Sequence, residues 1–164
     1  MFYKTISYFK FLLKSTNQHG VHSPFVYNFV TKGLYKKENT IVDFKEYSAL
    51  KNLSKKEQKV LSKVIRYFKI DEFKFELKTS KNSLDKNHKL FFINQIESLI
   101  DFNFTTLNSK QIIVVHGIHQ QKETTLRWQE IIKNKEATVT IDLYYFGIIF
   151  IRKKQAKEHF ILRI

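Results

Sequence analysis

Two pairs of histidines are the residues whose spacing most directly suggests chemistry in this chain. His19 and His22 are three residues apart, as are His116 and His119. On a helix this spacing places both imidazoles on one face, where they could bind a metal ion. His19 and His22, however, lie in a glycine-containing loop, where bonds to the backbone that fix the loop are the commoner role. The chain has no HExxH, phosphate-loop or GxSxG motif, so we expect no metal site and no catalytic residue of these kinds.

The second histidine pair directly follows a short, continuous apolar run at residues 112–115. Such a run is typical of a strand that is buried on both faces of a parallel sheet. Alternation or further apolar runs predict other strands at 73–77, 90–93, 138–143, 147–151 and 159–163. The pattern of residues 122–133 predicts a helix between strands. Alternating strands and helices of this kind indicate an α/β sheet.

The first third of the chain is predicted to be helical. Phe2, Ile6, Phe9 and Leu13 recur at helical spacing and predict an amphipathic helix over residues 2–14. Ser23 precedes Pro24 as an N-cap would, which predicts the start of a second helix. A third, short helix is expected near residues 47–50.

A longer helix is predicted over residues 54–69. Ser54 and Glu57 have the spacing of a capping box, in which each side chain bonds to the other residue's backbone N–H group. Val60, Leu61, Val64, Ile65 and Phe68 then form an apolar stripe. We therefore expect residues 1–164 to form a single domain, with a helical N-terminal extension at 1–53 and an α/β sheet at 54–164.

Composition narrows the classes of protein to consider. The 164 residues include no cysteine, which excludes disulfides, thiolate metal sites and cysteine nucleophiles. Lysines interrupt the apolar residues at the N-terminus, so no signal peptide is expected. No apolar run approaches the roughly 20 residues of a membrane-spanning helix. These features predict a cytoplasmic protein without a membrane span.

The formal net charge is +14, and the first 37 residues carry six lysines and no acidic residue. A bias of this size can attract nucleic acid or an anionic membrane surface. The alternative is that lysine simply fills solvated positions, because lysine, asparagine, isoleucine and phenylalanine are abundant throughout the chain. Nucleic acid therefore stays among the expected partners.

Both ends of the chain resemble one family of proteins. Residues 17–30 read NQHGVHSPFVYNFV, and residues 137–164 read ATVTIDLYYFGIIFIRKKQAKEHFILRI. These segments resemble the two ends of a bacterial family of class I S-adenosylmethionine (SAM) dependent methyltransferases. The resemblance implies a Rossmann-like methyltransferase sheet, here with a reduced number of strands, a helical N-terminal extension and C-terminal antiparallel strands. It also implies transfer of a methyl group from SAM.

The middle of the chain departs from that family where the cofactor would bind. Glu76, Thr79 and Ser80 match the family's glycine-rich turn, but Lys78 and Asn82 occupy its two glycine positions. A Cβ at these positions blocks the close approach of the backbone to a ligand. A lysine there also brings positive charge toward the positive sulfonium of SAM.

The turn after residues 112–115 departs in a similar way. His119 and Trp128 match the family, but His116 and Gly117 replace two carboxylates. Acids at the end of a strand accept hydrogen bonds from a cofactor or substrate, and these two residues cannot replace them. The degenerate cofactor positions implied by the resemblance are therefore Glu76, Thr79, Ser80, His116, Gly117 and His119.

The sequence thus predicts a truncated, degenerate methyltransferase-like protein without catalytic activity. Only about 40 residues separate the two matching parts, room for one or two strand–helix units. An active SAM-dependent methyltransferase with an aberrant cofactor site and a basic nucleic-acid-binding module remain as alternatives. No cofactor is expected, or SAM if the ancestral activity survives. Missing units should also leave residues 91–93 and the terminal hairpin short of neighbours, which predicts a homodimer or a complex with an intact methyltransferase relative.

Overall fold

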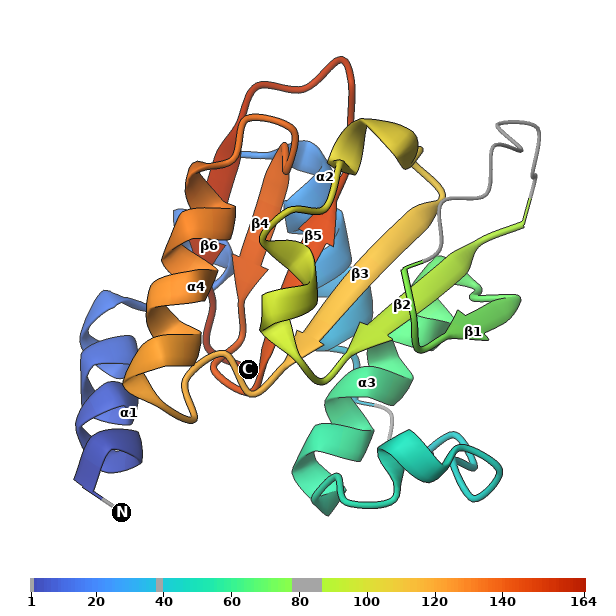
Figure 1. Ribbon diagram of the computed structural model, residues 1–164, viewed down its shortest axis with the longest axis horizontal. Helices are drawn as coiled ribbons and strands as arrows, with labels where there is room; N and C mark the ends of the chain where they lie inside the picture. Colours follow the sequence, from blue (N-terminus) through green and yellow to red (C-terminus); the bar gives the residue numbers. More distant parts are fainter. Residues whose placement is uncertain (1, 38–39, 78–86) are drawn as a thin grey trace.

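The computed structural model describes residues 2–37, 40–77 and 87–164. One mixed sheet of six strands runs through the molecule in the order β1-β2-β3-β5-β4-β6 (Figure 1). Its strands, in chain order, are β1 (Glu72–Lys74), β2 (Lys89–Ile93), β3 (Gln111–His116), β4 (Val139–Asp142), β5 (Phe146–Phe150) and β6 (Glu158–Ile161). The predicted α/β fold class is confirmed.

Strand directions divide the sheet into two parts. β1, β2 and β3 are parallel to one another, and β5 then runs antiparallel to both β3 and β4. β6 pairs with β4 in parallel, so the expected C-terminal antiparallel arrangement holds for β5 and not for β6. A short turn joins antiparallel β4 and β5, whereas parallel β4 and β6 need the longer connection that β5 and the following loop provide.

Helices and short helical turns cover both faces of the sheet. The helices are α1 (Phe2–Lys14), α2 (Pro24–Phe29), α3 (Lys55–Phe68) and α4 (Lys122–Lys133), and a π-helical segment (Val30–Leu34) continues α2. The 3-10 turns are Gln18–Gly20, Ser48–Leu50, Ile96–Leu99 and Phe104–Thr106. The described helices are all shorter and more polar than a membrane-spanning helix would be.

Each face of the sheet has its own apolar core, because successive side chains of a strand point to opposite faces. On one face Leu90, Phe92, Ile112 and Val114 pack against α2 and α3. On the other, residues including Phe91, Ile93, Ile113 and Val115 pack against α4 and the 3-10 turns. The expectation that residues 91–93 would lack neighbours is therefore wrong. The hairpin of β4 and β5 is equally buried.

Hydrogen bonds join the helical N-terminal extension to the β6 edge of the sheet. Thr16 forms a parallel bridge with Leu162, in which the Thr16 N–H donates to the Ile161 carbonyl and the Arg163 N–H to the Thr16 carbonyl. Ser23 does precede the helix at Pro24, but its hydroxyl makes no capping bond. Instead its oxygen accepts a hydrogen bond from the Gln155 amide at 2.8 Å. The predicted cap is therefore wrong in its chemistry, and Ser23 ties α2 to the loop after β5.

The amphipathic helix at residues 2–14 is confirmed in extent, but its apolar stripe faces outward. Ser7 and Phe11 are the buried residues of α1. Phe2, Phe9 and Leu13 are 86%, 62% and 87% exposed. The face that periodicity would normally assign to a core is thus open to solvent.

Candidate functional site

Three of the six predicted cofactor positions meet at the end of β3. His116 is the last residue of that strand, and Gly117 and His119 lie in the turn that follows it. Glu76 is exposed beyond the end of β1, two strands away in the sheet. Thr79 and Ser80, together with Lys78 and Asn82, lie outside the described residues. The turn after β3 is therefore the part of the predicted site that the structure places.

His116 is paired with an acid from the first turn of α3. Its Nε2 lies 2.8 Å from Oε1 of Glu57, and both side chains are largely buried, at 18% and 13% exposed. The capping box predicted for α3 positions this acid: the Ser54 N–H donates to Glu57 Oε2 at 2.7 Å, and the Glu57 N–H donates to the Ser54 hydroxyl at 3.3 Å. Each carboxylate oxygen of Glu57 thus has a partner within the chain.

These bonds favour the ionised form of Glu57. Burial by itself would raise the pKa of this carboxyl, but hydrogen bonds from His116 and Ser54 outweigh burial and lower the pKa from its ordinary value of 4.5 to about 2. A depressed folded-state pKa contributes stability at pH values above about 4.5, and this contribution is lost as the pH falls toward 2.

Glu57→Gln isolates this contribution, since glutamine also completes a capping box but does not titrate. Near neutral pH, we expect the free energy of unfolding of the wild type to be about 1–2 kcal/mol higher than that of the variant. This range takes into account that solvent at the helix end screens part of the interaction. The difference should vanish as the pH approaches 2. Urea denaturation of both proteins across this range measures it, and a difference that is independent of pH would contradict the assigned cause.

Gly117 forms a tight turn. Its φ of +74° is a conformation that residues with a Cβ rarely adopt. Its N–H donates to the Tyr145 carbonyl at 2.8 Å, and its own carbonyl accepts from the Gln120 N–H at 2.9 Å. A Cβ at this position would lie 2.6 Å from Cδ of Gln120. The glycine is therefore required by the turn, which brings His119 back toward the sheet.

His119 links the sheet to α1. Its Nε2 lies 2.7 Å from Oδ2 of Asp142, at the end of β4, and its Nδ1 lies 3.1 Å from the Ser7 hydroxyl. The imidazole stacks on the Tyr144 ring at 5.3 Å and 11°. The Tyr144 N–H donates to Asp142 Oδ1 at 2.8 Å, and the Tyr144 hydroxyl donates to the Lys4 carbonyl at 2.8 Å. These contacts fasten α1 to the ends of β3 and β4.

An acid, a histidine and a serine in this order are the groups of an acyl-transfer triad. Such a triad also needs N–H donors aimed at the developing oxyanion. Ser7 lies in the middle of α1, where backbone N–H groups bond to the preceding turn and are not available. Asp142, His119 and Ser7 connect β4, the turn after β3 and α1, and we call this arrangement the clamp.

A groove of about 540 Å³ lies between α1 and α4, and all three clamp residues line it. His119, Asp142 and His159 line it together with apolar residues of both helices, including Ile6 and Leu126. Burial lowers the pKa of His159, although the nearby Asp142 opposes this, so the neutral form of this histidine is favoured. The groove therefore has apolar walls and a polar floor, and Lys10, Lys14 and Lys122 add positive charge to its lining.

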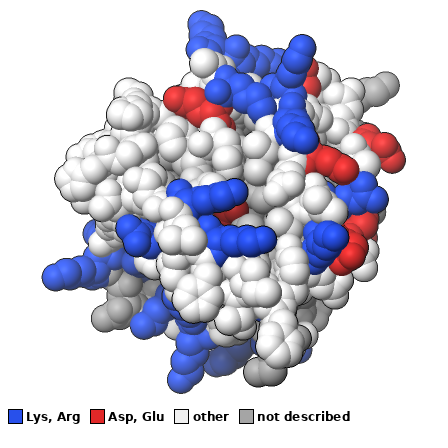
Figure 2. Space-filling model, turned by 90° about the vertical axis from the view of Figure 1, so that its left-hand side faces the viewer, with Lys and Arg blue, Asp and Glu red and all other residues white. Residues whose placement is uncertain are grey.

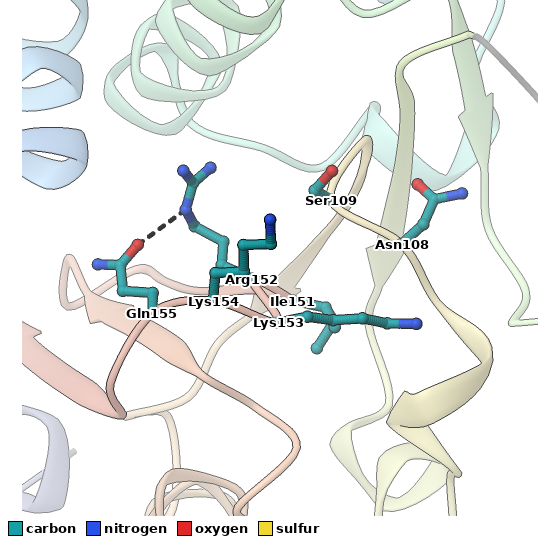
Figure 3. Close-up of a pocket in the computed structure, with 7 residues that line it drawn as sticks. All are labelled: Asn108, Ser109, Ile151, Arg152, Lys153, Lys154 and Gln155. Atoms are coloured by element: carbon teal, nitrogen blue, oxygen red, sulfur yellow. Dashed lines mark hydrogen bonds between the residues drawn. The ribbon is translucent and has the colours of Figure 1, made fainter.

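A second hollow, of about 550 Å³, lies at the opposite end of the strands, where β5 ends and β3 begins. Figure 3 shows Arg152, Lys153 and Lys154 around it, with Asn108 and Ser109 on the facing loop. The Arg152 guanidinium stands 4.0 Å from the centre of the Phe25 ring, and its Nε donates to the Gln155 side chain at 2.8 Å.

Sequence reasoning missed several partners at the end of β3. Asp142 has a signal in the sequence, because it ends a strand that alternates apolar and polar residues, as His116 follows another. Glu57 was recognised only as part of the helix cap. Ser7 and Tyr144 carry no local signal, since their contacts to His119 join segments more than 20 residues apart.

The chain was compared with protein-family models, with curated proteins and with solved structures, and none of the three comparisons gave a match.

Proposed function

We propose that this chain is a shortened, methyltransferase-like domain that neither binds SAM nor transfers methyl groups. The proposal rests on the sequence resemblance of both ends together with the state of the site at the end of β3. The mixed α/β sheet is compatible with a reduced Rossmann-like methyltransferase.

The main support for the proposal is that two acids beside the end of β3, Glu57 and Asp142, already bond to other residues of the chain. Glu57 accepts bonds from Ser54 and pairs with His116. Asp142 accepts a bond from Tyr144 and pairs with His119. All four carboxylate oxygens already have partners in the chain, and the two side chains are only 13% and 5% exposed, so little of either acid is accessible to the hydroxyl groups of a cofactor. Breaking a buried pair to free one of them would cost several kcal/mol.

The space beside the pair of Glu57 and His116 is also small, whereas the larger groove between α1 and α4 adjoins only the pair of His119 and Asp142. The cavity that Glu57, Gly117, His119, Tyr144 and Lys4 help to line has a volume of about 120 Å³. Sites for drug-sized ligands typically occupy roughly 300–1,000 Å³. SAM is of that size, so this cavity would have to open before the cofactor could enter it.

Isothermal titration calorimetry of the purified chain with SAM tests the proposal. We expect no binding tighter than a dissociation constant of about 100 µM. S-adenosylhomocysteine, which lacks the sulfonium charge, is titrated in parallel. Binding of this neutral ligand alone would show that the cavity opens and that positive charge is what excludes SAM.

Binding of SAM tighter than about 100 µM would overturn the proposal and favour an active methyltransferase with an aberrant cofactor site. The same sample must show a cooperative thermal transition, which excludes unfolding as the reason for a negative titration.

A further inference from the structure

We propose that the outward face of α1 binds the surface of an anionic lipid bilayer. The binding surface consists of Phe2, Ile6, Phe9 and Leu13, and we call it the α1 stripe. This inference does not depend on whether the chain binds SAM, because the stripe lies on the outside of the helical extension.

The α1 stripe is a continuous apolar surface. Its four side chains are 86%, 51%, 62% and 87% exposed, in chain order. With 3.6 residues per turn, they lie within about 60° of one another around the helix axis. Single exposed apolar side chains are ordinary on protein surfaces, but an aligned set of this kind marks an interaction site.

The stripe is not required to hold α1 in place. The opposite side of the helix makes the attachments: Ser7 contacts His119, Phe11 is buried against Tyr144, and the Lys4 carbonyl accepts the Tyr144 hydroxyl. The helix is therefore already folded and docked on the sheet. Little ordering entropy remains to oppose binding of the stripe to another surface.

Lysines accompany the stripe and point to an anionic partner. Lys10 and Lys14 lie beside it on the side of the groove, and Lys122 of α4 lines the same groove. Figure 2 views this side of the molecule, where blue lysine and arginine side chains cross and border the white surface and outnumber the red acidic ones. α1 itself contains no acidic residue. An amphipathic helix with phenylalanine and leucine on one face and lysine beside them is the type that lies in the interface of an anionic membrane.

Leu126 of α4 extends the apolar surface across the groove. Its side chain is 49% exposed, and both it and Ile6 line the groove. α1 and α4 run side by side at this edge of the molecule (Figure 1). The surface presented to a bilayer would thus be two helices wide, with the lysine ammonium groups reaching outward to lipid phosphates while their stems stay on apolar surface.

The charge of the chain favours a membrane, and not a second copy of the chain, as the partner that binds the α1 stripe. Two copies that each carry +14 repel one another when their lysine-rich faces approach. An anionic bilayer attracts the same face, and each lysine near its surface strengthens binding. Nucleic acid would also attract the lysines, but it offers no apolar layer in which Phe2 and Leu13 could be buried.

Vesicle co-sedimentation tests the proposal, with the intact chain and two kinds of vesicle. We expect binding to vesicles of phosphatidylglycerol mixed with phosphatidylcholine, and at least tenfold weaker binding to phosphatidylcholine alone. Phe9→Ser/Leu13→Ser should weaken binding to the anionic vesicles at least tenfold. Lys10→Glu/Lys14→Glu should also weaken it, and added salt should weaken the wild type by screening.

Matched variants elsewhere on the chain provide the controls. Ile100→Ser removes an apolar side chain that is 40% exposed and follows the 3-10 turn Ile96–Leu99, outside α1. Lys153→Glu/Lys154→Glu reverses two exposed charges at the hollow beside Arg152. Both should bind vesicles within twofold of wild type. All variants change exposed residues, so each is expected to keep the thermal transition of the wild type.

Three results would overturn the proposal. One is equal binding of wild type and Phe9→Ser/Leu13→Ser to the anionic vesicles. Another is loss of binding in Lys153→Glu/Lys154→Glu, which would place the membrane contact at the hollow beside Arg152. The third is a dimer in light scattering that Phe9→Ser/Leu13→Ser converts to a monomer, which would make a second copy the occupant of the stripe.

Discussion

Replacing Asp142 by alanine is expected to lower the free energy of unfolding by about 3–5 kcal/mol, because it leaves a buried charged or polar partner without its counterpart. Asp142 is 4% exposed. Its two oxygens hold the His119 imidazole and the Tyr144 N–H group, at 2.7 and 2.8 Å. Removing the carboxylate leaves both groups buried without these bonds. Urea denaturation followed by circular dichroism measures the loss.

The matched control is Asp43→Ala. The Asp43 side chain is 71% exposed and lies 3.7 Å from the ammonium of Lys45, whose side chain is 90% exposed, so its removal should change stability by less than about 0.5 kcal/mol. A loss below about 1 kcal/mol for Asp142→Ala would contradict the clamp. Since His119 also contacts Ser7, the Asp142 variant should in addition speed hydrogen exchange in α1 more than in α3.

Local patterns predicted most of the elements, because their causes lie within a few neighbouring residues. The capping box at Ser54 and the stripe behind it predict a helix, and the structure has α3 at Lys55–Phe68 with that box formed. The apolar runs of β2 and β3 likewise predict buried strands, and both are buried. In these segments, propensity, capping and burial favour the same conformation.

Predictions from a single pattern were less accurate where tertiary contacts compete with it. Phe73, Phe75 and Leu77 alternate as in a strand, yet β1 ends at Lys74. β1 is an edge strand with one neighbour, and Tyr47 packs against both Phe73 and Phe75, at 5.3 and 5.7 Å between ring centres. Side chains two residues apart in a strand share one face, so this common contact agrees with the alternation through Phe75. The pairing of β1 with its single neighbour β2 ends at Lys74, and the strand is therefore shorter than predicted.

The site was the part least open to prediction. The turn of His116 and His119 could be identified from its place after a strand, but its partners come from α1, α3 and β4. Pairings between segments so far apart have no periodicity that a single sequence reveals. The outward direction of the α1 stripe has the same origin. Helical spacing predicts which side chains share a face, and the docking contacts decide which face is buried.

Trp128 and Gly147 also form a contact between distant segments. Replacing Trp128 is expected to cause the second large loss of stability. Trp128 of α4 is 1% exposed and packs among the apolar residues on one face of the sheet. Its six-membered ring covers Gly147 of β5 so closely that a Cβ there would lie 2.6 Å from Cη2 of the ring. We expect Trp128→Ala to lower the free energy of unfolding by about 3–5 kcal/mol, through lost apolar burial and the cavity left behind.

The control for Trp128→Ala is Leu126→Ala, on the same helix. Leu126 is 49% exposed, so its loss should cost less than about 1 kcal/mol. If the two variants lost the same free energy of unfolding, the cause would be the helix propensity or solvation of α4. Packing under the indole would then not account for the loss.

A double-mutant cycle then tests the contact between Trp128 and Gly147. In the wild type, Gly147→Ala should cost about 1–3 kcal/mol, because the added methyl group must push the indole away from a packed sheet. In the Trp128→Ala background the space above residue 147 is open, so the same substitution should cost little or even restore some stability. The coupling energy between the two positions should therefore exceed about 1 kcal/mol. Equal costs of Gly147→Ala in both backgrounds would mean that the indole does not rest on this glycine, and that another residue accounts for the burial of α4 on β5.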